Sequence, residues 1–239
     1  TNKPINNTSI NLNKFFNFYL GELFHNKYRL ISILTWGIFI CISIVLYGMI
    51  YILPQVLEKY EKLNIENNKN ITTSNNNSNN KIDDNKENIN ELSNSLFIDL
   101  IINAFLEIPS MIFATYLSGF GRIKSMAIGF FVSFIASLLS IFSERLFFTG
   151  ISFLKFFICI PDVVIYLYIC EAFPTQIRSL ALGVGSSFSR IGGILTPFLN
   201  QILFDFYYLA PFYLSAIASL FGYLFTMNLP FETLDKNIR

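Results

Sequence analysis

Apolar runs about as long as a membrane-spanning helix divide this chain, and they constrain its fold more than any other feature. We place six of them, at residues 30–53, 96–117, 125–142, 150–170, 180–203 and 207–229. A run of roughly 20 apolar residues can cross a bilayer as a helix, which satisfies its own backbone hydrogen bonds. Only 14% of the residues are charged, whereas soluble domains carry about 25%. The sequence therefore predicts an all-α membrane protein with six transmembrane helices.

A polar tract separates the first apolar run from the second. Residues 58–95 are rich in Asn, Ser and charged residues, and Pro54 marks the end of the run before them. Such a composition buries too little apolar surface to offset the entropy lost on ordering, so we predict disorder. Two N-glycosylation sequons begin at Asn70 and Asn76, but a tract this rich in Asn and Ser produces such matches by chance.

The distribution of basic residues predicts the orientation of the helices, because Lys and Arg concentrate in cytoplasmic loops. If the N-terminus is cytoplasmic, nine basic residues fall in cytoplasmic segments, and Arg145 is the one that falls in the short external loops. The Asn-rich tract then lies outside, and long loops have little influence on orientation. We therefore expect both ends of the chain on the cytoplasmic side.

Several classes of function have no support in the sequence. The chain has one histidine, His25, and its three cysteines lie in apolar runs, so neither a metal-ligand spacing nor a Ser/His/Asp set occurs. Gly183 and Gly185 lie within an apolar run and do not follow a strand, which argues against a phosphate-binding loop. Basic residues do not alternate with aromatic ones, so we expect no nucleic acid. We also expect no enzyme, no catalytic residues, no metal and no cofactor.

The second apolar run carries ionisable groups on one helix face. Asp99, Asn103 and Glu107 follow at i, i+4 and i+8, with Glu107 near mid-depth and Pro109 just after it. Ionisable groups inside membrane spans are costly and mostly functional. The face therefore predicts either the lining of a solute pathway or a polar seam between packed helices.

The fourth run repeats this pattern. Lys155, Cys159, Asp162 and Tyr166 share a face, at i, i+4, i+7 and i+11. Lys155 is shallow enough to extend outward as an anchor. Asp162 lies deeper, so we single it out with Tyr166.

The fifth run presents two faces. Small residues at every fourth position, which let another helix approach closely, form the first: Ala181, Gly185, Ser189 and Gly193. The second lies about 100° around the helix and consists of Ser186, Arg190, Pro197 and Gln201. We expect this second face to look into the protein or a wet cavity.

Arg190 lies near the middle of the fifth run, and two interpretations of it are open. A buried ion pair with Asp162 or Glu107 would give it a structural role. An arginine that is free in one state would instead receive a solute carboxylate through two parallel hydrogen bonds. We favour solute contact.

The connection between the fourth and fifth runs resembles a signature of the major facilitator superfamily, E-x-[FY]-P-T-x-x-R between spans ten and eleven. Its fixed positions are occupied here by Glu171, Pro174, Thr175 and Arg178. Residues 181–198 are similar to the organic ion transporter and synaptic-vesicle-two-like branch of that family. Two further matches are weaker: Glu107-Ile108-Pro109 resembles an E-x-P motif in span eight, and Gly121-Arg122 resembles a remnant of the charged loop between spans eight and nine.

This resemblance implies the C-terminal six-helix half of a major facilitator fold. It makes residues 1–28 the tail of a central cytoplasmic loop, 29–57 span seven, 58–95 an external loop, 96–230 spans eight to twelve, and 231–239 a cytoplasmic tail. The superfamily binds solute between two halves that rock about a midplane site in the lipid bilayer. An N-terminal half, upstream in the same chain or supplied by a partner, is therefore expected.

The resemblance also implies a secondary transporter that moves a small organic solute by alternating access. Anion and zwitterion carriers of the branch tend to have Arg at the position of Arg190, so an anionic or zwitterionic solute is expected. The candidate contacts with the solute are Arg190, Glu107, Asp162, Tyr166 and Ser186. Coupling to a proton or another ion would involve Glu107 or Asp162.

The chain departs from the family pattern at one place. Ser118-Gly119 stand where the loop motif has Asp-Arg, and the missing acid normally joins a charge network near the elbow between spans ten and eleven. Arg122, Glu171 and Arg178 would then have to pair differently. This departure motivates the alternative of a non-transporting sensor or assembly partner of the same fold. A sugar-transporter-like carrier is a further alternative.

Overall fold

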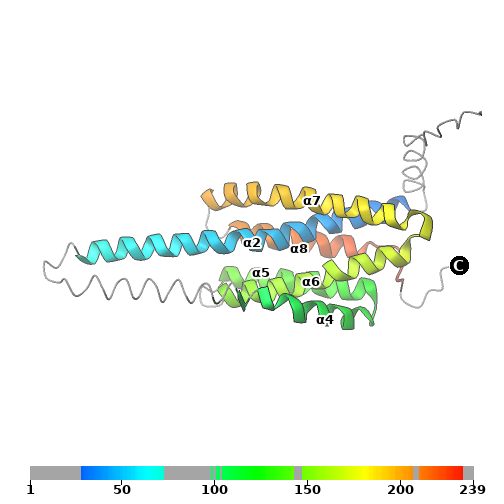
Figure 1. The fold of residues 1–239 in the computed structure, drawn as a ribbon, viewed down its shortest axis with the longest axis horizontal. Helices are drawn as coiled ribbons and strands as arrows, with labels where there is room; N and C mark the ends of the chain where they lie inside the picture. The colour runs from blue at the N-terminus through cyan, green and yellow to red at the C-terminus, as the bar shows by residue number, and fades with distance from the viewer. Residues whose placement is uncertain are drawn as a thin grey trace, which may run out of the picture.

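The described part of the chain is a bundle of helices. The computed structural model describes residues 28–72, 98, 101–102, 104–142, 147–206 and 210–233. The helices are α2 (Arg29–Thr72), α4 (Glu107–Ser118), α5 (Arg122–Phe142), α6 (Phe147–Ala172), α7 (Thr175–Phe206) and α8 (Ala210–Met227). They run along the long axis of the molecule, and these residues contain no strand (Figure 1). The predicted all-α fold is confirmed.

Within the described residues, four helices are long and apolar enough to cross a membrane. These spans are Arg29–Tyr51, Arg122–Ile141, Gly150–Ala172 and Ala210–Met227, and they match the first, third, fourth and sixth predicted runs. α7 has 32 residues but is less apolar than α5, α6 and α8, because it contains Arg178, Arg190 and many Gly and Ser residues. The described α4 has 12 residues. The structure supports a multi-pass membrane protein, and the count of six spans stays a prediction.

α2 is longer than the sequence predicts. It continues through Pro54 and ends at Thr72, so the prediction of disorder is wrong for residues 58–72. Proline removes one backbone hydrogen bond and bends a helix without always ending it. Beyond it, Glu58 and Lys62 have the i, i+4 spacing that stabilises a helix. The rest of the predicted disordered tract, the N-terminal loop before residue 28 and the end of the C-terminal tail lie outside the described residues, as do Asp99 and Asn103.

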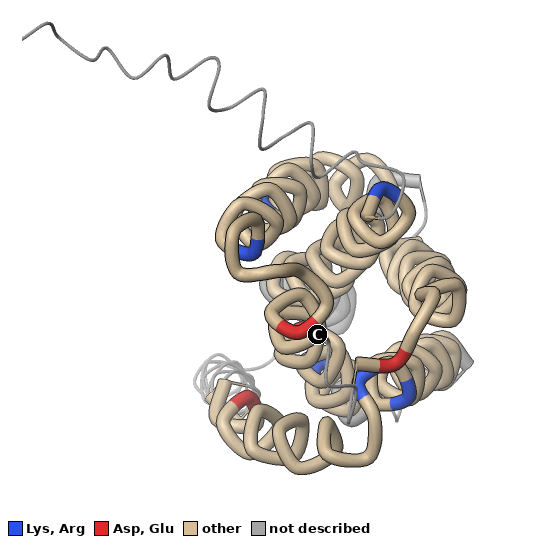
Figure 2. The backbone as a smooth tube through the Cα atoms, turned by 90° about the vertical axis from the view of Figure 1, so that its right-hand side faces the viewer, with Lys and Arg blue, Asp and Glu red and all other residues tan. Residues whose placement is uncertain are grey.

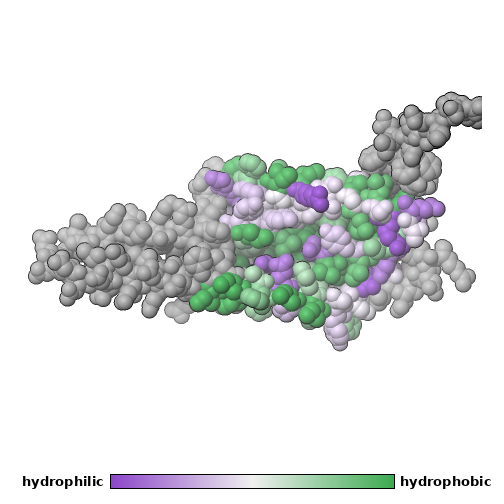
Figure 3. Space-filling view, in the orientation of Figure 1, coloured by the Kyte–Doolittle hydropathy of each residue, from purple (hydrophilic) through white to green (hydrophobic). Residues whose placement is uncertain are grey.

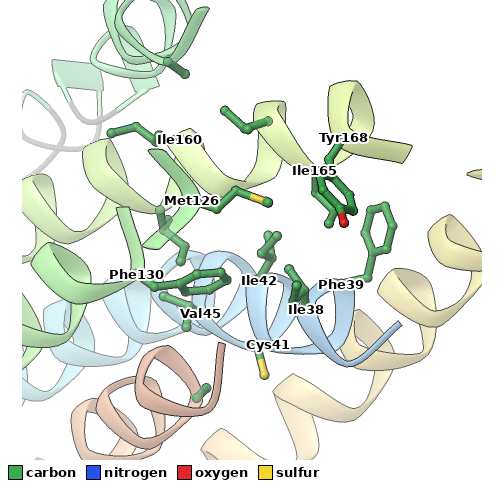
Figure 4. Packing of buried hydrophobic residues seen from close by; sticks show 14 of the residues in the cluster. Ile38, Phe39, Cys41, Ile42, Val45, Met126, Phe130, Ile160, Ile165 and Tyr168 are labelled. Atoms are coloured by element: carbon green, nitrogen blue, oxygen red, sulfur yellow. The ribbon is translucent and has the colours of Figure 1, made fainter. Parts of the chain in front are cut away.

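The apolar core lies where α2, α5, α6 and α8 meet. Figure 4 shows side chains of α2 packed toward those of α5 and α6. Fully buried members from these three helices are Ile38, Phe39, Ile42, Val45, Met126, Phe130, Ile165 and Tyr168. α4 packs mainly on α6, and α7 packs mainly on α2, so these two helices lie at the edge of the core.

The outer faces of α4 and α7 remain apolar and exposed. Ile112 and Tyr116 of α4 and Ile194 and Phe198 of α7 each expose more than half of their surface. Figure 3 shows hydrophobic residues over much of the visible face of the bundle, with hydrophilic residues at one end and also in places along its middle. Apolar surface of this extent suits lipid or another membrane helix better than water.

Small residues of α7 let it approach α2 closely. A Cβ atom placed on Gly185 would lie 2.5 Å from a ring carbon of Phe39, and one placed on Gly193 would lie 2.9 Å from the ring of Tyr47. Real Cβ atoms do not come this near to another heavy atom. The two aromatic rings of α2 therefore occupy space that only glycine leaves free, as the spacing of small residues along α7 predicts.

Two side-chain contacts reinforce this helix pair. The hydroxyl oxygens of Ser43 and Ser189 lie 2.6 Å apart, which joins α2 to α7 by a hydrogen bond. The rings of Trp36 and Phe188 stack with their centroids 4.9 Å apart. The position of α7 along α2 is therefore fixed at several points.

We predict that Gly185→Ala destabilises the protein and that Gly183→Ala does not. Both changes favour the helix by about 1 kcal/mol. The new methyl group at position 185 would meet the buried Phe39 ring, and overpacking of this kind costs about 1–3 kcal/mol. At position 183 nothing lies within 4 Å of the added atom. Thermal unfolding of the two purified variants measures the difference, and equal midpoints would show that the contact with Phe39 does not constrain the pair.

Candidate functional site

One polar face of α6 packs against the start of α4. The Nζ atom of Lys155 lies 3.5 Å from Oε2 of Glu107, and the Lys155 side chain is only 15% exposed. Lys155 is thus part of an interhelical ion pair, and the prediction of an outward anchor is wrong. Ser110 lies beside Cys159, and its hydroxyl donates to the backbone oxygen of Glu107 at 2.7 Å. This part of the face is a polar seam between helices.

Asp162 continues the same face of α6 but has a different environment. Its side chain is half-buried, and among the described residues it makes no ion pair or hydrogen bond. It lies close enough to Glu107 for the two negative charges to repel each other. With Thr115, Tyr166 and Cys170 it lines an open depression of about 420 Å³ between α4 and α6. Asp162 is thus a carboxylate at an accessible surface of the bundle.

Arg190 lies near the middle of α7 and is exposed. In the described part of the chain it forms no ion pair, so neither Asp162 nor Glu107 neutralises it in this structure. Ser186, one turn earlier, donates its hydroxyl hydrogen to the backbone oxygen of Gly183 on its own helix, at 3.4 Å. The guanidinium is therefore available to a ligand.

Tyr166 connects the neighbourhoods of Asp162 and Arg190. Its ring meets Phe39 of α2 edge to face, with centroids 5.3 Å apart. Asp162, Arg190 and Tyr47 are all near enough to act electrostatically on its hydroxyl group. Asp162 and Tyr166 thus line one depression, and Glu107 lies in the seam beside it, whereas Arg190 belongs to α7.

The elbow between α6 and α7 lies at one end of the bundle. Pro174 and Thr175 are exposed, whereas Phe173 and Ile177 are buried and fix the turn. The backbone oxygen of Pro174 accepts hydrogen bonds from the amides of Ile177 and Arg178, at 3.1 and 3.0 Å. The Nε atom of Arg178 is buried and has no hydrogen-bond partner within the described ranges.

An ion pair ties α5 to the end of α6 at this elbow. Nη2 of Arg122 lies 2.7 Å from Oε1 of Glu171, and its Nε donates to Oε2 at 3.2 Å. Nη1 of the same arginine donates to the backbone oxygen of Ser118 at 3.0 Å. Arg122 and Glu171 therefore pair with each other, and Arg178 joins neither carboxylate in the described residues. In Figure 2, which views the bundle from this end, acidic and basic positions lie next to one another.

The segment after α8 completes this network with an acid that sequence reasoning missed. The Glu232 carboxylate accepts hydrogen bonds from the backbone amides of Arg122, at 2.6 Å, and Ile123, at 3.2 Å. Thr233 donates its hydroxyl hydrogen to Glu171 at 2.6 Å. Glu232 thereby places a negative charge at the N-terminus of α5, where the helix dipole favours it. We call Arg122, Glu171, Glu232 and Thr233 the charge clasp.

Gly121 makes room for the charge clasp. Its φ angle is +138°, and a Cβ atom there would lie 3.3 Å from the Glu232 carboxylate. Glycine adopts this backbone conformation without the strain that other residues incur. The only signal for Glu232 in the sequence was an acid close behind the last apolar run.

In the ranges that the structure covers, no group of three or more His, Cys, Asp and Glu side chains could hold a metal ion. The side chains of Asp162, Tyr166 and Arg190, and those of the charge clasp, can form ion pairs and hydrogen bonds.

We predict that Glu232→Gln lowers the thermal unfolding midpoint, because a neutral amide is a weaker cap for α5 than a carboxylate. Loss of a helix cap costs about 0.5–2 kcal/mol. Lys124→Gln is the matched control, since it removes a charge from an exposed residue in the same helix turn. Equal midpoints for the two variants would contradict the capping role of Glu232.

Comparison of the sequence with known proteins shows the family of the chain. The profile of the Major Facilitator Superfamily matches residues 92–237, which is more than half of the chain. The chain is 31% identical to svop-1 of Caenorhabditis elegans over 150 residues (62% of this chain and 29% of that protein). It is 34% identical to organic cation/carnitine transporter 7 of Arabidopsis thaliana over 130 residues (53% and 26%).

The longest of these similarities covers nearly the whole chain. Synaptic vesicle 2-related protein of Xenopus laevis is 25% identical over 234 residues, which are 92% of this chain and 39% of that protein. The chain thus spans between about a quarter and two fifths of the length of these relatives. The resemblance that rested on the elbow and on residues 181–198 is confirmed, and the chain belongs to the Major Facilitator Superfamily.

Proposed function

We propose that the protein carrying this chain is a secondary transporter that moves a small organic solute across a membrane past Arg190. The observation that carries this proposal is the state of Arg190, which lies within a helix of a membrane bundle, is exposed, and forms no ion pair among the described residues. An unpaired charge at that depth is costly. A charge of this kind is expected where a solute or water reaches it.

The names of the relatives support the same class of function. One is an organic cation/carnitine transporter, and another, 30% identical over 152 residues, is solute carrier family 22 member 16 of Homo sapiens. These names describe transporters and carriers and not enzymes. We propose no enzymatic activity.

The chemistry of arginine favours a solute that carries a carboxylate or a similar anion. The guanidinium presents a rigid fork of donors that matches the two oxygens of a carboxylate. Among the described residues no protein carboxylate occupies that fork. An anionic or zwitterionic solute would supply the missing counter-charge, whereas an uncharged sugar would leave it unmatched. We therefore prefer such a solute to the sugar-transporter-like alternative.

The mechanism that we propose is alternating access. The exposed apolar faces of α4 and α7 would partly be covered by an N-terminal six-helix half, in the same chain or in a partner, with the solute between the halves. The charge clasp would hold the ends of α5, α6 and the segment after α8 together in one of the conformations. In this arrangement both ends of the chain are cytoplasmic.

The alternative of a non-transporting sensor or assembly partner rested on Ser118-Gly119, where the family motif has an acid. In this chain Glu232 supplies an acid to the same end of the bundle from the segment after α8. The departure from the motif therefore no longer favours a sensor over a transporter.

We predict that Arg190→Gln in the full-length protein lowers uptake of its organic anion or zwitterion about tenfold or more, since charged hydrogen bonds are the strong ones. Arg190→Lys should recover only part of the uptake, because lysine keeps the charge and loses the fork. The measurement is initial uptake of labelled solutes, normalised to protein in the membrane.

Ser187→Ala is the control, because Ser187 is exposed on the same helix and bonds its own backbone at Gly183. It should leave uptake unchanged. Wild-type uptake of an established solute by Arg190→Gln would remove Arg190 from the pathway.

A further inference from the structure

One hydrogen bond between α2 and α7 has a fixed direction. The Ser43 hydroxyl donates to the backbone oxygen of Phe39 on its own helix, at 2.8 Å. A serine hydroxyl carries a single hydrogen, so Ser189 must be the donor in the 2.6 Å contact between the Ser43 and Ser189 hydroxyls. Two hydrogen bonds therefore run in series from α7 through Ser43 to the backbone of α2. We call Ser43 and Ser189 the serine bridge.

The contacts beside the serine bridge fix the spacing of α2 and α7 more than their rotation. Gly192 presents no side chain, and a Cβ atom placed there would lie 3.0 Å from Cβ of Ser43. The rings of Trp36 and Phe188 meet face to face, an arrangement that permits some sliding of one ring over the other. A hydrogen bond, in contrast, weakens steeply when its angle changes. Among these contacts, the serine bridge is the one that resists a rotation of α7 about its own axis.

This rotation matters because Arg190 directly follows Ser189. Consecutive residues of an α-helix point about 100° apart, so Arg190 lies beside the interface when Ser189 faces α2. Ile191, a further 100° around the helix, is exposed on its apolar outer face. An extended guanidinium lies about 8 Å from the helix axis, so a rotation of about 20° would move it by roughly 3 Å. A binding group has to be held within about 0.5 Å of its productive position.

We propose, on the basis of the proposed function, that Ser43 and Ser189 are positioning residues for Arg190. The serine bridge fixes the rotation of α7 and thereby holds the guanidinium in the direction from which a solute carboxylate reaches it. Without the bridge, the guanidinium would spend part of its time over the apolar outer face of α7. The two serines act through Arg190 and do not themselves contact the solute.

The first test measures the direction of residue 190 without any solute. Every cysteine of the full-length protein is replaced by alanine, and Arg190→Cys or Ile191→Cys is introduced singly. A charged thiosulfonate that does not cross membranes modifies each thiol, and the ratio of the two rates shows which position faces water. The thiol at position 190 should react faster, and Ser189→Ala should lower the ratio about threefold or more, since modification requires exposure of the thiolate.

Ser43→Ala breaks the serine bridge from the side of α2, so it should lower the ratio of rates to a similar extent. Ser189→Thr keeps the hydroxyl group and should recover most of the ratio. Ser187→Ala is the matched control, because Ser187 is exposed and bonds the backbone of its own helix at Gly183. An unchanged ratio in either Ser189→Ala or Ser43→Ala would overturn the inference.

The second test asks whether the serine bridge acts through Arg190. Uptake of labelled organic anions is measured for the wild type, for Ser189→Ala, for Arg190→Gln and for the double variant. Ser189→Ala should raise KM about tenfold and leave the maximal rate nearly unchanged, because it weakens binding of the solute. In the Arg190→Gln background it should add no further loss, since the two changes remove the same interaction. An equal loss in both backgrounds would mean that the serine bridge only holds the helices together, and the inference would be wrong.

The two tests separate this inference from the proposed function. If Arg190→Gln takes up every anion as the wild type does, the transport role of Arg190 is wrong, and the ratio of thiol rates still decides whether the serine bridge positions residue 190. If Arg190→Gln loses uptake and the ratio of thiol rates does not depend on the serine bridge, the proposed function stands and the inference fails. A lowered ratio together with the dependence on Arg190 in uptake would support both.

Discussion

The close approach of α7 to α2 determines where the polar groups of the candidate site lie. Gly185 and Gly193 have no side chain, so the rings of Phe39 and Tyr47 fill the space between the helices. The Phe39 ring also meets Tyr166 of α6, so three helices meet around this aromatic side chain of α2. Arg190 lies between the two glycines, and a rigid contact on each side keeps a flexible, charged side chain within a narrow region. The packing of aromatic rings against glycines thus fixes the backbone of α7 on both sides of Arg190.

The charges of the described bundle are arranged by depth. At the end with the elbow, Arg122 and Glu171 neutralise each other, and Glu232 is held by backbone amides. Between α4 and α6, Lys155 neutralises Glu107. Asp162 and Arg190, which lie within α6 and α7, form no ion pair among the described residues, and neither does Arg178 at the elbow. The paired charges join helices, whereas an unpaired charge within a membrane helix is costly, and this contrast is why we propose Arg190 as a solute contact.

Local patterns in the sequence predicted the helices and the face of α7 that packs on α2. The apolar runs specify helices because a chain in lipid must satisfy its own backbone hydrogen bonds, and small residues at every fourth position mark a close helix contact.

Contacts between distant segments could not be predicted in this way. Glu232 caps a helix that begins 110 residues earlier, and nothing in its own neighbourhood indicates that partner. Lys155 was interpreted from its depth alone, although its partner lies on α4. The sequence also left open whether Arg190 pairs with an acid of the protein, because only the structure sets the distances between them. The sequence analysis placed the end of α2 too early. It judged residues 58–95 by their average composition, although the first residues of this tract continue the helix.

That long helix has a mechanical consequence. At 1.5 Å per residue its 44 residues extend about 66 Å, roughly twice the hydrocarbon thickness of a bilayer. Its last part runs beyond the other helices (Figure 1). One continuous helix joins the buried core to this overhang, so a tilt of the core would be carried to its far end. The 21 residues that follow the apolar span extend about 32 Å at 1.5 Å per residue, so a tilt of about 10° would move the far end by roughly 5 Å. Rocking in the bilayer would thereby become a larger displacement in water, where a label at the tip can report it.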